Sequence, residues 1–255
     1  MHPATPRGRL GACLAFLLVA PLTATADGLS DLRSVLSRYP ADASFAAAAS
    51  VQAKGKSQEG AGARSGSTSF EVESNREGLW IRIPPTALRT AEAEAEAKKS
   101  DPDNPTPTRT AMVALTIFDV IDALDGAAML LDNLEGATLI SQTTAAHGGK
   151  PARLLRIKVK PTLAGTRSKF VNEPVIELRV WVDPSGIPVA AERDSNYSAS
   201  VVVASASNVR KERWEFAVAG DRLYASRSEQ EDRASAVGKS VVSSRSMTYV
   251  PRATR

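Results

Sequence analysis

The sequence is poor in the side chains on which many enzymes and metal sites depend. Its 255 residues include one cysteine, Cys13, and two histidines, His2 and His147. Cys13 and His2 lie in a segment that we expect to be removed, which would leave a chain with no thiol and a single imidazole. Such a chain forms no disulfide, no cysteine-ligated zinc site and no thiol nucleophile, and mechanisms that need two histidines are disfavoured.

A strong charge of one sign is also absent. The chain has 32 basic and 28 acidic residues, a formal net charge of +4. Loss of Arg7 and Arg9 with the first 26 residues, which hold no acidic residue, would leave +2. This balance gives no general electrostatic reason to bind nucleic acid. The apolar share of 43% and the charged share of 24% are typical of a globular protein.

The first 26 residues have the features of a secretory signal peptide. Arg7 and Arg9 precede the apolar run Leu10–Leu22, and Ala24-Thr25-Ala26 supplies the small residues of a cleavage site. The apolar run is shorter than the roughly 20 residues of a membrane-spanning helix. We therefore predict cleavage before Asp27 and a periplasmic or secreted product, with no transmembrane segment in the mature chain.

Residues 138–249 read almost entirely as strands. Apolar and polar residues alternate, as in Ile176, Leu178 and Val180, and short turn signals such as Asp183-Pro184-Ser185-Gly186 separate the runs. Short connections join antiparallel strands, and one-sided alternation indicates a sheet with one buried face. The expected strands are 45–54, 68–73, 79–83, Thr138–Ala146, Ala152–Lys160, Val175–Val182, Val189–Tyr197, Val201–Val218, Arg222–Ser228 and Ser240–Tyr249.

Two segments have the apolar spacing of helices that cover such a sheet. The first is 29–39, which Pro40 ends, and the second is Thr116–Leu134. In the second, Thr116 and Asp119 resemble a capping box, and Asp125 suits the cap of a further helix, so two helices and one bent helix are equally expected. The apolar face is expected to hold Ile117, Ile121, Leu124, Ala128, Leu131 and Leu134.

Residues 84–109 interrupt this pattern. Ala87–Lys99 favours a helix but has little apolar surface, and three prolines in 100–108 indicate a linker, so the segment is expected to be a solvated insertion. The whole pattern predicts one α+β domain over 27–255, a long curved antiparallel sheet (an incomplete barrel) with helices covering the concave face.

The order of these elements, with the hairpin Val180-Trp181-Val182-Asp183-Pro184-Ser185-Gly186-Ile187-Pro188-Val189, resembles the LolA/LolB-like group of periplasmic lipoprotein carriers, to which RseB-type sensors are related. The resemblance implies an incomplete barrel with an apolar lining and a helical lid, which can house acyl chains. It rests on element order over most of the mature chain. No short motif transfers a binding residue.

Motifs that suggest catalysis do not have the required surroundings. Gly62-Ala63-Arg64-Ser65-Gly66 matches the hydrolase pattern G-x-S-x-G, but it lies in a polar loop and His147 lies in a separate Gly-Gly turn. Asp119, Asp122 and Asp125 are better explained as the polar stripe and cap of a helix than as a glycosidase pair. We predict a protein that is not an enzyme and has no cofactor or metal.

The predicted function is therefore binding of a lipid acyl chain or a lipidated partner in the half-barrel. The alternative is an envelope scaffold or sensor that has a filled core and acts through protein contacts. The side chains expected to line a ligand are Ile81, Leu155, Ile157, Leu178, Val180, Trp214 and Phe216, with Leu115, Phe118, Ile121 and Leu124 in the lid.

Two surface features are open to two interpretations. The segment Lys150–Lys169 has no acidic residue, so Arg156, Lys158 and Lys160 form either a face for anionic head groups or an acidic partner, or simply the solvated side of a strand. Trp80 and Trp181 fall on the polar side of their strands, where a helix covers them or a partner binds, and we expect the helix.

Overall fold

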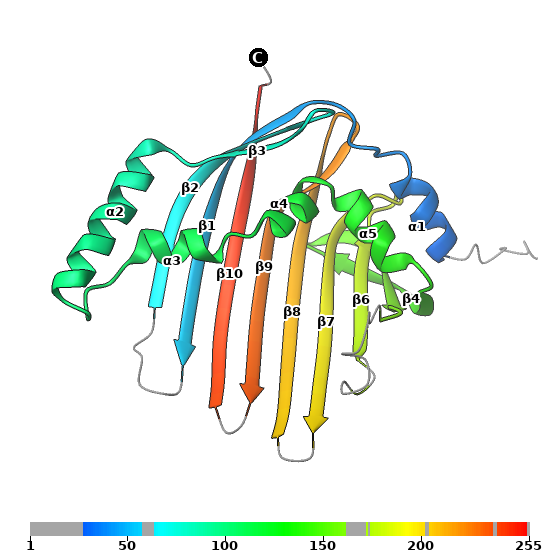
Figure 1. Cartoon of the computed structure of the whole chain (residues 1–255). Helices are drawn as coiled ribbons and strands as arrows, with labels where there is room; N and C mark the ends of the chain where they lie inside the picture. Colours follow the sequence, from blue (N-terminus) through cyan, green and yellow to red (C-terminus); the bar gives the residue numbers. More distant parts are fainter. Residues whose placement is uncertain are drawn as a thin grey trace, which may run out of the picture.

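The computed structural model describes residues 28–57, 64–161, 172, 174–201, 204–236 and 239–253. The expected signal peptide, at 1–26, lies outside these ranges. The described residues form ten strands and five helices (Figure 1).

The ten strands form one antiparallel sheet, in the order β3-β2-β1-β10-β9-β8-β7-β6-β5-β4. The strands are β1 Phe45–Ser57, β2 Arg64–Asn75, β3 Gly78–Arg82, β4 Thr138–His147, β5 Lys150–Lys158, β6 Val175–Val182, β7 Pro188–Val201, β8 Ala204–Ala219, β9 Arg222–Ala236 and β10 Lys239–Arg252. Its edges, β3 and β4, do not pair with each other in the described part of the chain, so the curved sheet stays open. The predicted fold class is confirmed.

Every predicted strand overlaps an observed one, but β7 and β9 extend well beyond the prediction. β9 continues from Ser228 to Ala236, where serine, alanine and charged residues replace the apolar alternation. These residues pair with β8 on one side and β10 on the other. Hydrogen bonding on both sides therefore carries β9 past the point where its hydrophobic pattern ends.

The helices are α1 Gly28–Leu36, α2 Pro85–Ser100, α3 Pro107–Ala114, α4 Ile117–Leu124 and α5 Gly126–Leu134. Helices α1, α3, α4 and α5 lie across the concave face of the sheet, whereas α2 stands away from it (Figure 1). No residue of α2 is buried, which agrees with a solvated insertion. The strands β7 to β10 continue below the helices, so part of the concave face is uncovered.

Helix α3 was not predicted, because Pro107 was interpreted as part of a linker. Proline is well suited to the first turn of a helix, where its missing N–H is not needed, and Pro107 begins α3. The helix packs closely on β2 at Gly66, where an added Cβ atom would lie 1.8 Å from the carbonyl oxygen of Pro107. Glycine at this position therefore allows the helix backbone to contact the strand.

The segment 116–134 forms two helices, one of the two outcomes expected. The Thr116 hydroxyl accepts a hydrogen bond from the Asp119 amide, which begins α4, and the Asp125 carboxylate caps α5 through the Ala128 amide at 3.0 Å. The predicted apolar face of α4 is right for Leu124, which is buried, and wrong for two residues. Ile117 and Ile121 are 53% and 44% exposed. The buried residues of α4 are Val120, Ala123 and Leu124.

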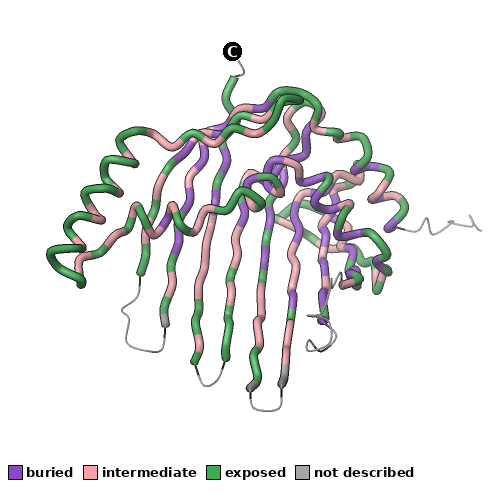
Figure 2. The backbone as a smooth tube through the Cα atoms, in the orientation of Figure 1, coloured by how far each residue is buried: buried purple, intermediate pink, exposed green. Residues whose placement is uncertain are grey.

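The core lies between these helices and the upper half of the sheet, where the buried backbone gathers in Figure 2. Leu32, Leu36 and Leu130 from the helices are almost fully buried in one cluster with Leu178 and other strand residues. Arg222, itself buried, donates hydrogen bonds to the Leu124 carbonyl at 3.1 Å and to the Ala41 carbonyl at 2.6 Å. Toward their lower ends the strands are mostly intermediate or exposed (Figure 2).

Candidate functional site

Most of the predicted ligand-lining residues lie in this core. Leu155, Ile157, Leu178 and Val180 have no exposed surface, and Leu124, Trp214 and Phe216 are also buried. Ile81 and Leu115 are partly buried against the same cluster. The structure therefore brings these nine residues to one apolar interior beneath the helices.

Two predicted lid residues do not cover this interior. Phe118 and Ile121 are 73% and 44% exposed. The reason is the orientation of α4, whose acidic stripe faces the sheet: the Asp119 carboxylate pairs with Arg245 on β10 at 2.6 Å. Phe118 and Ile121 are left on the solvent side.

The strand register arranges the concave residues in rows that cross the sheet, because directly paired residues of antiparallel strands share a face. The uppermost of four rows is mainly apolar: Val180, Ala191, Trp214, Ser228, Met247 and Val51. The next row is Leu178, Arg193, Glu212, Gln230, Arg245, Ala53 and Gly66. Below it are Ser195, Arg210, Asp232, Ser243, Gly55 and Arg64, and then Tyr197, Asn208, Ala234 and Val241.

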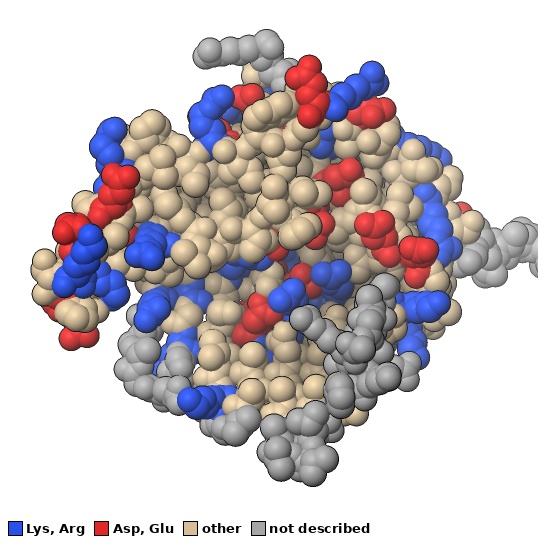
Figure 3. Space-filling view, in the orientation of Figure 1, with Lys and Arg blue, Asp and Glu red and all other residues tan. Residues whose placement is uncertain are grey.

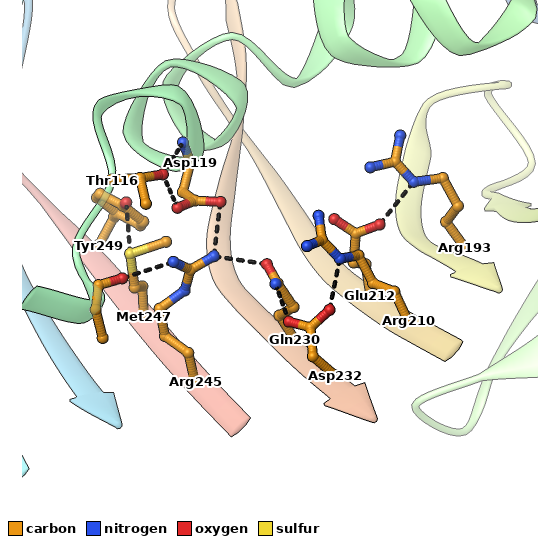
Figure 4. Close-up of polar contacts among 11 residues, drawn as sticks. Thr116, Asp119, Arg193, Arg210, Glu212, Gln230, Asp232, Arg245, Met247 and Tyr249 are labelled. Atoms are coloured by element: carbon orange, nitrogen blue, oxygen red, sulfur yellow. Dashed lines mark hydrogen bonds and ion pairs between the residues drawn. The ribbon is translucent and has the colours of Figure 1, made fainter. Parts of the chain in front are cut away.

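The two middle rows contain a charged belt, formed by Arg193, Glu212, Gln230, Arg245, Arg210 and Asp232. Its members pair along and between the rows (Figure 4). The Arg193 Nε atom lies 2.7 Å from a Glu212 carboxylate oxygen, and the Arg210 Nε atom lies 2.7 Å from an Asp232 oxygen. Gln230 donates to Asp232 and accepts from Arg245.

Arg245 connects this belt to the helices. Besides Asp119 and Gln230, its guanidinium donates to the Ala114 carbonyl oxygen at 2.6 Å, at the end of α3. At the other end of the belt Arg193 donates to the Asn133 side chain of α5 at 2.8 Å. The belt therefore closes the lower side of the core with groups that are satisfied by one another and by the helix layer.

Asp122 lies in an environment that disfavours the charged form of its carboxyl group. Burial raises the pKa of its carboxyl above the ordinary value. The nearby carboxylates of Asp119, Glu212 and Asp132 raise it further, and Arg193 opposes them. Because the charged form is disfavoured, Asp122 reduces the stability of the fold when it is ionised.

Below the belt the concave face holds an open groove with two parts. The α3 part has a volume of about 530 Å³ and lies between α3 and the strands β1, β2, β9 and β10. The rim part has a volume of about 550 Å³, and its lining is largely apolar. The residues lining the rim part are Tyr197, Ser198, Ala199, Ala206, Ser207, Asn208, Ala234, Ser235, Ala236, Lys239 and Val241. Val241 lines both parts, so they adjoin.

The space-filling view agrees with this division. Charged side chains form a band below the helices, and the surface beneath the band is mostly uncharged (Figure 3). Each part of the groove falls within the 300–1,000 Å³ usual for small-molecule sites. The groove is therefore the candidate binding site of the molecule.

Sequence reasoning missed this groove. Its apolar floor is made of Ala199, Ala206, Ala234, Ala236 and Val241, which have no distinctive hydrophobic pattern. The available signal was the pairing register: strands β8, β9 and β10 are joined by short connections, so Ala206 and Ala236, or Ala234 and Val241, fall opposite each other.

The predicted basic face includes an ion pair across strands β5 and β6. Arg156 is held by Glu177 through two contacts of 3.0 Å, which also lower the pKa of the Glu177 carboxyl. Lys158 and Lys160 are exposed, whereas Arg167 and Lys169 of the same segment lie outside the described residues. Arg156 is therefore engaged in a cross-strand ion pair.

The two tryptophans of the polar face also differ from the expectation. Trp80 is 44% exposed, so no helix covers it. Trp181 is partly buried beside His147, with 5.5 Å between the ring centroids. On the convex face Trp181 thus packs against the imidazole ring of His147, in the hairpin formed by β4 and β5.

The structure does not assemble the catalytic groups considered in the sequence. Ser65 lies within strand β2, and His147 ends β4, at the opposite side of the ten-stranded sheet. Gly62 and Ala63 of the hydrolase-like motif lie outside the described residues. Within the described ranges, no group of three or more His, Cys, Asp or Glu side chains is placed to hold a metal ion.

Comparison with known proteins gives no relative for this arrangement. No family model, no curated protein and no solved structure matches the chain. None of the helices in the described part of the chain has the length and apolarity needed to cross a membrane.

Proposed function

We propose that this chain is an exported, non-enzymatic protein that binds the acyl chain of a lipid or of a lipidated partner in the open groove. The observation that supports the proposal is the rim part of the groove, which the helices leave uncovered. Its volume is about 550 Å³ and its lining is largely apolar. An acyl chain would remove this surface from water, and each buried methylene contributes about 0.8 kcal/mol.

The proposal places the ligand below the charged belt, away from the residues expected from the sequence. Leu155, Ile157, Leu178 and Val180 have no exposed surface because helices α1, α4 and α5 already pack on that half of the sheet. A ligand there would have to displace the core. A ligand in the groove would displace only solvent.

The order of the elements also supports the proposal. An incomplete barrel with helices on its concave side is what the resemblance to the LolA/LolB-like carriers implies, and those proteins work in the periplasm. The expected signal peptide would deliver the chain to the same compartment.

Binding of a fluorescent long-chain fatty acid to the purified mature chain tests the proposal, together with mass spectrometry of co-purified lipid. Val241 and Val242 provide a matched pair, since each is 46% exposed and they are consecutive residues of β10. Val241 lines the groove, whereas Val242 faces the convex side. We expect Val241→Trp to weaken binding about tenfold or more, and Val242→Trp to bind as the wild type does.

Two results would contradict the proposal. One is the absence of both co-purified lipid and saturable binding of the fatty acid by the wild-type chain. The other is an equal effect of the two tryptophan substitutions. The packed core is also what the alternative function requires, an envelope scaffold or sensor acting through protein contacts, and such a protein would give the first of these results.

A further inference from the structure

One edge of the sheet lacks the features that usually keep an edge strand from pairing further. The edge strand β4, Thr138–His147, is 10 residues long and contains no Lys, Arg, Asp, Glu or Pro. The opposite edge strand, β3, is 5 residues long, ends with Arg82 and is followed by Pro84-Pro85. Short length, charge and proline protect an edge against further pairing, and β4 has none of these three features.

The hairpin of β4 and β5 determines which backbone groups of β4 point outward. Gly148 and Gly149 both have a positive φ, 56° and 76°, as in a type I′ turn, and His147 pairs with Lys150 across this turn. The residues that flank such a turn are hydrogen-bonded to each other, so every second residue counted back from His147 is bonded to β5. The residues between them direct their N–H and C=O groups away from β5: Gln142, Thr144 and Ala146.

In the described part of the chain, no strand or turn pairs with these outward groups. Helix α1 comes close to β4, but it does so on the concave face. An added Cβ atom at Gly28 would meet the side chains of Gln142 and Leu155, which lie opposite each other on β4 and β5. The backbone edge itself is open, and its chemical complement is another extended backbone.

The side chains of β4 favour a second copy of the same strand as its partner. A bulge after Leu139 leaves Ser141–His147 as the regular part of β4, and Thr144 is the midpoint of this part. In a twofold antiparallel pair centred there, Thr144 lies opposite Thr144 of the second copy, and Gln142 lies opposite Ala146. No like charges meet in this pairing, and paired threonines are favourable neighbours across strands. The uncharged strand is therefore complementary to itself.

We propose that this chain forms a weak twofold dimer in which β4 pairs antiparallel with β4 of a second copy, centred on Thr144. The two sheets then join into one continuous sheet. The groove lies on β1, β2 and β7 to β10, away from β4, so it stays open in the dimer and the inference does not depend on the proposed ligand. Because one strand from each copy makes a small interface, we expect a dissociation constant in the micromolar range.

Cysteine cross-linking tests both the contact and its register. Apart from Cys13 of the expected signal peptide the chain has no cysteine, and Thr143 and Thr144 are consecutive exposed threonines. In the proposed pair the two Thr144 Cα atoms lie about 5.5 Å apart, within the range of a disulfide, whereas the two Thr143 Cα atoms lie about 8 Å apart. We expect Thr144→Cys to form a covalent dimer under mild oxidation and the control Thr143→Cys to remain largely monomeric.

Sedimentation of the mature chain at increasing concentration measures the equilibrium without a cross-link. Thr144→Pro removes an outward N–H group, which the fold of an edge strand does not need. We therefore expect this variant to keep a urea midpoint close to that of the wild type and to dimerise about tenfold or more weakly. If Thr144→Pro does not fold, the two cysteine variants still decide the question.

Three results would overturn the dimer. The first is a wild-type chain that stays monomeric at millimolar concentration, and the second is a dimer that a folded Thr144→Pro variant leaves unchanged. The third is equal cross-linking at Thr143 and Thr144, because the proposed register brings only Thr144 opposite itself. None of these results bears on the fatty-acid assay, so the dimer and the proposed function stand or fall separately.

Discussion

Replacement of Arg245 by methionine tests whether the charged belt fastens the helices to the sheet. The substitution keeps the aliphatic stem but removes the guanidinium that contacts the Asp119 carboxylate, the Gln230 side-chain oxygen and the Ala114 carbonyl, each at 2.6 Å. The Arg245 and Asp119 side chains are 13% and 23% exposed, so this ion pair is intermediate between a surface pair and a fully buried pair.

These limits give the expected magnitude. Exposed ion pairs contribute about 0–1 kcal/mol, and breaking a fully buried pair costs about 3–5 kcal/mol. For Arg245→Met we expect a loss of about 2–3 kcal/mol in the free energy of unfolding. In a chain of this size each kcal/mol lowers Tm by about 2–4 °C, so the expected decrease in Tm is about 4–12 °C.

Urea unfolding followed by far-ultraviolet circular dichroism measures this loss, with Arg156→Met as the control. Arg156 also pairs with one carboxylate, at 3.0 Å, but its side chain is 46% exposed, so its removal should cost less than about 1 kcal/mol. A double-mutant cycle with Asp119→Asn should give a coupling energy of about 1–2 kcal/mol. Equal costs for Arg245→Met and Arg156→Met, with no coupling to Asp119, would refute the role of the belt.

Three further substitutions test the packing and electrostatics of the helix layer. Leu124→Ala should cost about 2–5 kcal/mol in urea unfolding because Leu124 is 2% exposed, whereas Phe118→Ala, at a site 73% exposed, should cost less than about 1 kcal/mol; the reverse order would mean that α4 is rotated. Gly66→Ala should destabilise by about 1–3 kcal/mol because its new methyl group meets the backbone of Pro107, and an unchanged urea midpoint would contradict that contact. Burial raises the pKa of the Asp122 carboxyl in the folded state, so its ionisation costs stability as the pH rises above the pKa of this group in the unfolded chain. Asp122→Asn should therefore raise the urea midpoint at pH 7 and lose this gain near pH 3. A gain that is independent of pH would contradict the assigned cause.

The sheet could be predicted from the sequence because one of its faces is buried. Alternation such as Ile176, Leu178 and Val180 arises only where every second residue packs on a core, and these three residues are buried. The turn after β6 was equally specific. Gly186 has a φ of 87°, and its amide donates to the Asp183 carbonyl at 2.9 Å, as expected for Asp183-Pro184-Ser185-Gly186.

The face of α4 could not be predicted from apolar spacing alone. The spacing of Ile117, Ile121 and Leu124 suggests one stripe, but Asp125 ends α4 and starts α5, so each short helix takes its own rotation. What fixes the rotation of α4 is a contact distant in sequence, the pair of Asp119 with Arg245. Local periodicity holds no information about such a partner.

The candidate site was missed for a related reason, since it depends on where the covering layer ends. Tyr197 and Val241 would have been core residues if the helices had extended over them, and the alternation along β7 and β10 is the same in either case. The signal that marks the boundary is the charge pattern across strands. Arg193 and Glu212 are paired across β7 and β8, and Arg210 pairs with Asp232 across β8 and β9.

This pattern has a direct physical meaning. An ion pair on an otherwise apolar face is tolerated only where it is close to water or where all its hydrogen-bonding groups have partners. In an apolar interior the cost of desolvating both charges exceeds their attraction. When two antiparallel strands carry opposite charges at the same number of residues from the turn that joins them, the charges are direct neighbours. If both also face the core side of the sheet, they predict the position along the strands at which the packed core ends. In this chain that depth separates the packed half of the sheet from the open groove, where a ligand can bind without displacing the core.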